Sequence, residues 1–147
     1  MRVLVLHGPN LNLLGSREPE IYGTTTLEEL DQHVKNEAGE LGIEVEIHQS
    51  AREGELIELL HEGIGSIDGA ILNPAAYSHT SRALAEAVRA VPFPVIEVHL
   101  SNIHAREPWR SRSVTAEAAA GVVAGFGPIS YLVALRALKA LAEDRVT

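Results

Sequence analysis

The chain has 147 residues, of which 46% are hydrophobic and 22% charged, and this size and composition predict one globular catalytic domain spanning residues 1–147. It contains no cysteine, which excludes disulfides, thiol nucleophiles and thiolate metal sites and makes the reducing cytoplasm its expected location. The net charge of −8 argues against a nucleic-acid surface, and the apolar run at residues 3–6 is too short for a signal peptide or a membrane span.

The first elements in chain order are a strand and a helix. Residues 2–7, RVLVLH, form a β-branched and leucine-rich run ended by Gly-Pro, which predicts a buried parallel strand. Apolar residues recur at helical spacing within 24–42, and this pattern predicts an amphipathic helix. Thr26 and Glu29 are spaced as a capping box at its start, and Gly42 is a typical end.

The same alternation continues to the end of the chain. Further strands are expected at 43–50, 69–73, 94–100 and 119–126, and further helices at 54–65, 80–91 and 129–143. Parallel strands need crossover connections, and helices in those connections cover the sheet. We therefore expect an α/β fold with a flavodoxin-like, doubly wound five-stranded parallel sheet in the order 2-1-3-4-5, with helices on both faces. The second strand alternates apolar residues with Glu44, Glu46 and His48, which predicts an edge position.

Residues 7–23, HGPNLNLLGSREPEIYG, concentrate breaking and polar residues between the first strand and the first helix. Gly8, Pro9, Gly15, Pro19 and Gly23 predict that this segment forms neither helix nor strand. Such a segment suits a mobile lid that covers a substrate and excludes water.

Candidate site residues follow the carboxyl ends of three predicted strands. In a doubly wound sheet, ligands bind beyond these ends, and polar stretches occupy residues 7–23, 73–81 and 99–113. One rim would therefore gather Asn10, Arg17, Tyr22, Asn73, His79, Glu97, His99, Ser101, Arg106 and Arg110. Arginine supplies ten of the 12 cations, and because the guanidinium fork matches a carboxylate, the rim predicts a small anionic ligand.

Several candidates also have a purely structural interpretation. His79 lies where Ser78 or Thr80 could cap a helix, and His99 ends a strand where buried histidines are often only hydrogen-bonded core residues. Glu97 is two residues from His99 and points to the same face of its strand. It could therefore orient the imidazole, which favours a functional role for the pair.

A base role for Tyr22 depends on a neighbouring cation. Phenols ordinarily keep their proton up to about pH 10, so a tyrosine is a poor base at neutral pH unless a cation stabilises the phenolate. Arg17 lies five residues before Tyr22 in the chain. The run Arg106, Arg110 and Arg112 is also compatible with a solvated loop.

Other known site patterns are missing from the sequence. His99 and His104 lack a metal-site spacing, and the stretch GPNLNLLG matches neither phosphate-binding loop pattern. The first strand does not end in paired acidic residues, as a phosphoacceptor domain would require.

Four long stretches together resemble type II 3-dehydroquinate dehydratases across essentially the whole chain: HGPNLNLLGSREPEIYG, ILNPAAYSHTS, IEVHLSNIHARE and GPISYLVALRAL. The resemblance implies a flavodoxin-like fold, a homododecamer of four trimers, and no metal or organic cofactor. It also implies conversion of 3-dehydroquinate, a small anionic hydroxy acid, to 3-dehydroshikimate in the shikimate and quinate pathways.

The resemblance also implies roles for individual residues. Tyr22 would be the base that removes the C2 proton, and Arg17 would support its ionisation from the lid. Asn10 would stabilise the enolate through a water, and His99, beside Glu97, would be the acid for the departing C1 hydroxyl.

The remaining implied roles concern substrate binding. The substrate's hydroxyls and carboxylate would be held by Asn73, His79, Ser101, Arg110 and the backbone at Leu100, with Arg106 on the same rim and lid. Glu86 would reach the site of a neighbouring subunit, where aspartate is often seen in the family. Ser78, Arg82 and Arg112 also depart from the commonest family pattern, and Arg82 and Glu86 bear on the trimer contact.

Dehydration beside a ketone needs a base, a place for enolate charge and an acid. The alternative route through a lysine Schiff base needs a buried lysine, and the only lysines, Lys35 and Lys139, fall within predicted helices away from the strand ends. We therefore predict an enolate route without a covalent adduct.

Two other functions fit the same rim. One is a non-catalytic module that binds small anions through its arginines, with Tyr22 as a stacking lid. The other is a different α/β lyase or a hydrolase with Ser81 or Ser101 as nucleophile, although the GxSxG pattern is missing.

Overall fold

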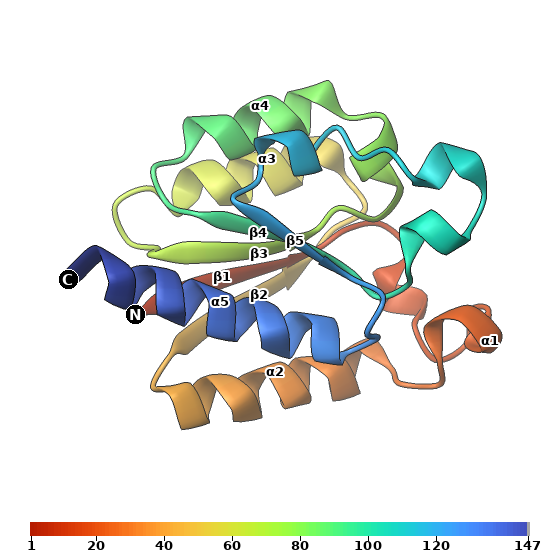
Figure 1. The fold of residues 1–147 in the computed structure, drawn as a ribbon, viewed down its shortest axis with the longest axis horizontal. Coiled ribbons are helices and arrows are strands. Elements are labelled where there is room, and N and C mark those ends of the chain that lie inside the picture. The colour runs from red at the N-terminus through yellow and green to blue at the C-terminus, as the bar shows by residue number, and fades with distance from the viewer. Residues whose placement is uncertain (147) are drawn as a thin grey trace.

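A parallel sheet between two layers of helices forms the fold (Figure 1). The computed structural model describes residues 1–146. The strands are β1 (Arg2–His7), β2 (Glu44–Gln49), β3 (Gly69–Asn73), β4 (Val95–His99) and β5 (Gly121–Ala124). Their order is β2-β1-β3-β4-β5, and all neighbouring pairs run parallel. The predicted sheet and its strand order are confirmed.

Burial of the strands follows their position in the sheet. Strands β3 and β4 are buried at every residue, and β1 is buried after Arg2, because helices cover both of their faces. Strand β2 alternates between exposed and half-buried residues at its start and has no fully buried residue. Its predicted edge position is therefore confirmed.

The helices pack in pairs on the two faces of the sheet. Their bounds are α1 (Pro19–Tyr22), α2 (Leu27–Leu41), α3 (Glu53–Glu62), α4 (Arg82–Ala90) and α5 (Ile129–Val146). Helices α2 and α5 cover one face, and α3 and α4 cover the other (Figure 1). Across residues 1–146, none of these helices has both the length and the apolar character of a membrane span.

Helix α2 begins and ends as its sequence predicts. The hydroxyl of Thr26 accepts the backbone N–H of Glu29 at 3.1 Å, which satisfies one of the free donors at the helix start. Gly42 follows the helix with φ 72°, a left-handed conformation that glycine adopts without the steric cost of a Cβ atom.

The start of α4 corrects one expectation. Its capping residue is Ser81, whose hydroxyl accepts the N–H of Leu84 at 3.0 Å. Ser78 and Thr80 do not cap it, because Ser78 lies within a preceding 3-10 turn, Ala75–His79, and Thr80 follows that turn. Ser81 has the extended backbone directly before the helix that a cap requires.

The core on the α2 and α5 face shows how closely helix and sheet approach. Leu30, Val34, Leu135 and Leu138 are fully buried there. A Cβ atom added at Gly69, the first residue of β3, would lie 2.9 Å from the Leu138 side chain. A glycine at this position therefore allows α5 to pack directly on the sheet.

The loop after β1 is more ordered than its sequence predicts. Residues Leu11–Leu13 form a 3-10 turn, and Pro19–Tyr22 form the short helix α1, so the expectation of neither helix nor strand in 7–23 is wrong. Pro19 occupies the first turn of α1, where its fixed φ favours a helix and its missing N–H costs nothing. The helix α1 lies beyond the end of the sheet, on the same side as the loops that follow β1 and β4 (Figure 1).

Candidate active site

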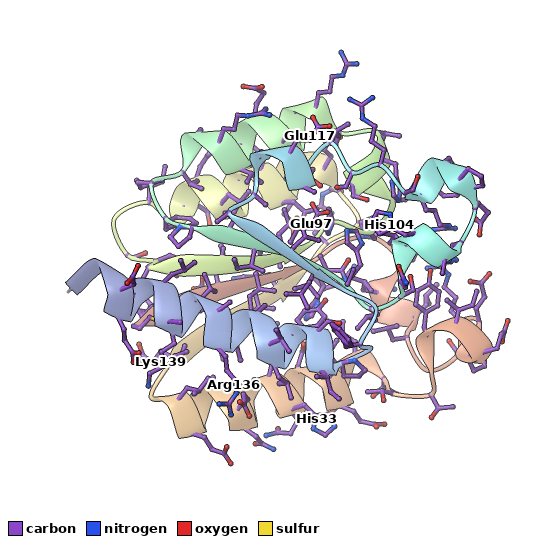
Figure 2. All side chains as sticks on the ribbon, in the orientation of Figure 1. His33, Glu97, His104, Glu117, Arg136 and Lys139 are labelled. Carbon is purple, nitrogen blue, oxygen red and sulfur yellow. The ribbon has the colours of Figure 1, made fainter. Side chains whose placement is uncertain are left out.

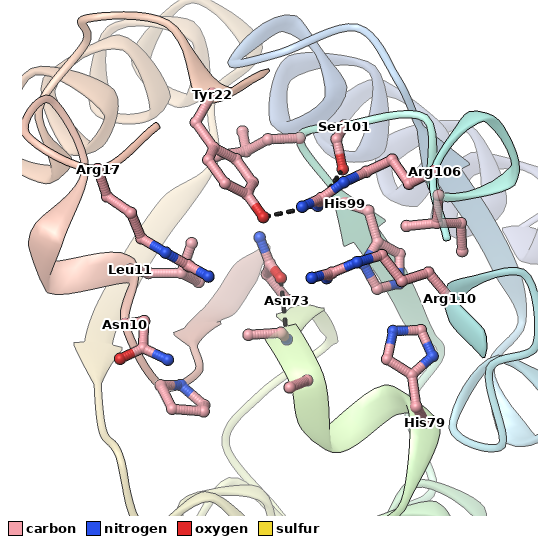
Figure 3. A pocket seen from close by; sticks show the side chains of 15 residues that line it. Asn10, Leu11, Arg17, Tyr22, Asn73, His79, His99, Ser101, Arg106 and Arg110 are labelled. Carbon is pink, nitrogen blue, oxygen red and sulfur yellow. Dashed lines mark hydrogen bonds between the residues drawn. The ribbon is translucent and has the colours of Figure 1, made fainter. Parts of the chain in front are cut away.

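A pocket lies at the carboxyl edge of the sheet, between the loops that follow β1, β3 and β4 (Figure 3). It is lined by Pro9, Asn10, Leu11, Arg17, Tyr22, Asn73, Ala75, Ala76, His79, His99, Leu100, Ser101, Ile103, Arg106 and Arg110. Every residue that the sequence nominates for the site is among them except Glu86 and Glu97. The three polar stretches therefore meet in one pocket.

Tyr22 lies between two arginines. Its hydroxyl oxygen accepts a hydrogen bond from Arg106 Nη1 at 2.6 Å, and the guanidinium carbons of Arg17 and Arg106 lie 5.1 and 5.2 Å from its ring centre. The sequence points to Arg17 as the cation for Tyr22, but the direct hydrogen bond comes from Arg106, from a loop 84 residues away. Two guanidinium groups therefore lie beside the Tyr22 ring, and one of them donates to its hydroxyl.

Arg106 is itself held in place by polar neighbours. It donates to Ser101 Oγ at 3.3 Å, and carboxylate oxygens of Glu18 and Glu107 lie 3.8 and 3.9 Å from its guanidinium nitrogens. Only 11% of its side chain is exposed. A cation so enclosed is less screened by water, which strengthens its effect on Tyr22.

His99 is hydrogen-bonded to a buried carboxylate. Its Nε2 lies 2.7 Å from Glu97 Oε2, and both side chains are buried. The Ser113 hydroxyl donates to the same Glu97 oxygen at 2.6 Å, and the Thr115 hydroxyl donates to the other oxygen. Three donors compensate the hydration that the carboxylate loses on burial.

The hydrogen bond to Glu97 determines which ring nitrogen of His99 carries a hydrogen. Because the Glu97 carboxylate only accepts, His99 Nε2 carries the hydrogen between them. The other ring nitrogen, Nδ1, remains for a ligand in the pocket that His99 lines. Ser113 and Thr115 are absent from the sequence-based candidates, since no local pattern links them to a glutamate 16 and 18 residues earlier.

A close backbone contact joins the loops after β1 and β3. The N–H of Gly8 donates to the carbonyl of Asn73 at 2.8 Å, and a Cβ atom at Gly8 would lie 2.8 Å from the backbone of Pro74. Only glycine permits this approach. Two residues on, Asn10 has φ 72°, a left-handed conformation that asparagine tolerates better than most residues. Its side chain lies at the edge of the pocket (Figure 3).

Arg110 and His79 line the part of the pocket away from Tyr22 (Figure 3). Arg110 donates to Glu107 at 2.7 Å and lies over the Trp109 ring at 4.1 Å. That hydrogen bond is the main cause of a lowered pKa at Glu107. His79 Nδ1 lies 2.8 Å from the carbonyl of Arg112, which fixes its ring and leaves Nε2 for a ligand.

Glu86 lies elsewhere. It is on α4, pairs with Arg89 at 3.1 Å, and lines a charged surface hollow that also includes Arg82, Arg112 and Glu117. It does not line the pocket of its own chain. Among residues 1–146, no group of three His, Asp or Glu side chains is arranged to hold a metal ion.

Known proteins resemble this chain over nearly its full length. The sequence model described as "Dehydroquinase class II" matches residues 1–139. The 3-dehydroquinate dehydratase of Pelotomaculum thermopropionicum is 54% identical over 142 residues, which cover 97% of this chain and 99% of that protein. The 3-dehydroquinate dehydratase of Chelativorans sp. is 57% identical over 139 residues, with 94% and 96% covered.

Two solved structures agree with the sequence matches. The crystal structure of a type II dehydroquinase from Butyrivibrio crossotus superimposes with a TM-score of 0.92 at 40% identity, covering 94% of this chain and 97% of that one. The corresponding structure from Propionibacterium acnes gives 0.91 at 42% identity, covering 95% and 96%.

Proposed function

The chain belongs to the class II dehydroquinase family, and from this premise we propose that it dehydrates 3-dehydroquinate through an enolate, with Tyr22 as base and His99 as acid. The activity is that of a 3-dehydroquinate dehydratase, a hydro-lyase of the shikimate pathway. The assignment of these two roles rests on one observation. Tyr22, beside two arginines, and His99, hydrogen-bonded to the Glu97 carboxylate, line the same pocket.

In the first step Tyr22 takes the C2 proton of the substrate, and the electron pair of that C–H bond enters the enolate. Arg106 supports this role because its hydrogen bond to the phenol oxygen strengthens when the oxygen becomes negative. Arg17 adds a second positive charge near the ring. The enolate oxygen gains negative charge in this step, and Asn10 is proposed to stabilise it through a water.

In the second step the enolate expels the C1 hydroxyl. His99 donates a proton from Nδ1 to this oxygen, so that water leaves and the conjugated double bond of 3-dehydroshikimate forms. Glu97 supports the protonated imidazole, because a carboxylate 2.7 Å from Nε2 stabilises the positive ring. The hydroxyls of Ser113 and Thr115 hold that carboxylate in position.

The substrate is held by donors around the rest of the pocket. We assign its carboxylate to Arg110, whose planar guanidinium matches a carboxylate, and its hydroxyls to Asn73, His79, Ser101 and the backbone at Leu100. Each of these residues lines the pocket. Glu86 is proposed to act only from a neighbouring subunit.

No Schiff base is part of the proposed route. No lysine lines the pocket. Lys139 lies on α5 far from His104 and the loops of the carboxyl edge (Figure 2), and its ammonium donates to the carbonyl of Leu41 at 2.6 Å. Lys35 belongs to α2. A substrate adduct trapped with borohydride would contradict this proposal.

We also propose that copies of the chain assemble, up to the dodecamer of four trimers that the family resemblance implies. Large apolar side chains are exposed on β5, on the loop after it and on α5, including Val122, Phe126, Ile129 and Val133. Exposed apolar side chains beside an edge strand are typical of an interface. Sedimentation at several concentrations tests this, and a monomer at all of them would contradict it.

Tyr22→Phe tests the assignment of the base. It removes the proton acceptor and keeps the ring beside the two arginines, so we expect kcat to fall at least 100-fold while the Kd for 3-dehydroquinate changes less than tenfold. Tyr77→Phe is the matched control, because the Tyr77 hydroxyl donates to the carbonyl of Ala51, outside the pocket. Near-normal turnover by Tyr22→Phe would refute the role of Tyr22.

A further inference from the structure

A buried chain of hydrogen bonds runs from the pocket to the surface of α2. Asn73 Nδ2 lies 3.0 Å from Tyr131 Oη, Tyr131 Oη lies 2.9 Å from His7 Nδ1, and His7 Nε2 lies 2.7 Å from Asp31 Oδ1. Asn73, Tyr131 and His7 are buried, and the Asp31 side chain is 24% exposed. The mechanism above uses Asn73 and none of the other three.

The donor and acceptor groups fix the direction of each of these three hydrogen bonds. Asn73 Oδ1 accepts the backbone N–H of Ala75 at 3.1 Å. A backbone N–H only donates, so the amide oxygen faces Ala75 and the amide nitrogen faces Tyr131. That nitrogen also only donates, and the oxygen of Tyr131 therefore accepts from it.

The hydroxyl hydrogen of Tyr131 is then free for His7. It pairs with His7 Nδ1 if that nitrogen is unprotonated, in which case Nε2 carries a hydrogen and donates it to Asp31. The opposite tautomer would leave the Tyr131 hydrogen without an acceptor and would turn a bare nitrogen toward a carboxylate. Asp31 thus selects the tautomer of His7, and His7 selects the direction of the Tyr131 hydroxyl.

Tyr131 is suited to remain a phenol. Desolvation by burial is the main cause of its raised pKa, so the hydroxyl keeps its hydrogen and serves as a donor to His7.

We propose that Tyr131, His7 and Asp31 are positioning residues that fix the Asn73 amide as a hydrogen-bond donor to an oxygen of the substrate. This inference rests on the proposed function of the pocket. Both polar atoms of the amide already have a partner: the oxygen accepts from the Ala75 N–H, and the nitrogen donates one hydrogen to Tyr131. The second N–H remains for the substrate, and the amide nitrogen points toward the middle of the pocket (Figure 3).

The arrangement has a consequence for specificity. A fixed donor binds a hydroxyl, carbonyl or carboxylate oxygen and leaves a substrate lacking that oxygen with an unpaired amide in the pocket. An asparagine free to flip would accept either a donor or an acceptor. Together with the Ala75 N–H, the three residues therefore set which end of the amide the substrate meets.

Tyr131→Phe tests the proposal, because it removes the oxygen that accepts from the amide nitrogen and leaves the Ala75 bond to the amide oxygen in place. Loss of one neutral hydrogen bond corresponds to a change of about 3- to 10-fold. Asn73 transfers no proton, so we expect KM for 3-dehydroquinate to rise by about that factor and kcat to stay within about twofold. Tyr77→Phe, which removes a hydroxyl bonded to a backbone carbonyl, should leave both constants unchanged.

A double-mutant cycle separates positioning from general stabilisation. In an Asn73→Ala background, Tyr131→Phe should cause no further rise in KM, since the amide it positions is gone. Asp31 is the partly exposed end of this series of hydrogen bonds. Asp31→Asn should raise KM less than Tyr131→Phe does, and it should also lose its effect in the Asn73→Ala background. This second variant decides the question if Tyr131→Phe does not fold.

Two outcomes would overturn the proposal. One is a lowered Tm with unchanged KM in both variants, which would show that these hydrogen bonds only stabilise the fold. The other is a KM effect that persists in full when Asn73 is alanine. If the unmodified enzyme does not turn over 3-dehydroquinate at all, the proposed function fails instead, so the two failures are distinguishable.

Discussion

Replacing Glu97 with glutamine tests the acid assignment most sharply, because it removes a charge and almost no volume. The glutamine oxygen can still accept from His99, and its amide can turn toward Thr115, whose hydroxyl also lies 3.1 Å from Ser113. The pocket wall therefore keeps its shape. What is lost is the negative charge 2.7 Å from His99 Nε2.

The magnitude follows from the burial of the pair. Removing one partner of a buried ion pair costs about 3–5 kcal/mol, and glutamine restores one neutral hydrogen bond, worth about 1 kcal/mol. The remaining loss of about 2–4 kcal/mol destabilises the protonated imidazole. We expect kcat at pH 7 to fall by roughly 30- to 1,000-fold.

The assay is the absorbance of the conjugated product under saturating 3-dehydroquinate at pH 7. Glu46→Gln is a matched control, because Glu46 also precedes a histidine by two residues on a strand, with 3.5 Å between the groups, but both side chains are about half exposed. It should leave kcat unchanged. A folded Glu97→Gln enzyme with kcat within threefold of the unmodified enzyme would show that the Glu97 charge does not support His99 as the acid.

Three further predictions concern stability. Leu135→Ala, in the buried contact of α5 with the sheet, should lower the free energy of unfolding in urea by about 2–5 kcal/mol. Leu141→Ala, on the exposed side of α5, should lower it by under about 1 kcal/mol. Equal losses in the two variants would contradict this packing. Thr26→Ala should cost about 1 kcal/mol by removing the cap of α2, and Thr24→Ala, which removes no cap, should cost much less; the reverse order would contradict the assignment. Because the pKa of Tyr131 is raised on folding, unfolding releases a proton above about pH 10. The free energy of unfolding should therefore fall there by up to about 1.4 kcal/mol per pH unit. If a Tyr131→Phe enzyme loses stability with pH just as steeply above about pH 10, another group is responsible.

The elements of the fold were accessible from sequence because local patterns determine them. The helix expected in 24–42 and its Thr26 cap are found at Leu27–Leu41, since an amphipathic stripe and a capping side chain both act within a few residues. The short helix α1 is the exception. Pro19 stands among residues typical of a loop, and because proline also favours the first turn of a helix, the local pattern does not distinguish the two.

The site was accessible only in part, and the reason is sequence distance. Glu97 and His99 share one strand face, so their contact could be inferred from spacing. The bond from Arg106 to Tyr22 spans 84 residues, and the bond from Tyr131 to His7 spans 124. Such contacts depend on how the loops and α5 pack, which no local pattern specifies.

Dehydration by an enolate route is measured by the absorbance of the conjugated product when the purified protein is mixed with 3-dehydroquinate, with and without borohydride pretreatment of the enzyme and substrate together. We predict enzyme-dependent product formation that borohydride leaves untouched, as an enolate route without a covalent adduct requires. Folded protein that forms no product, or that borohydride inactivates through a trapped adduct, would show that the enzyme does not use this route.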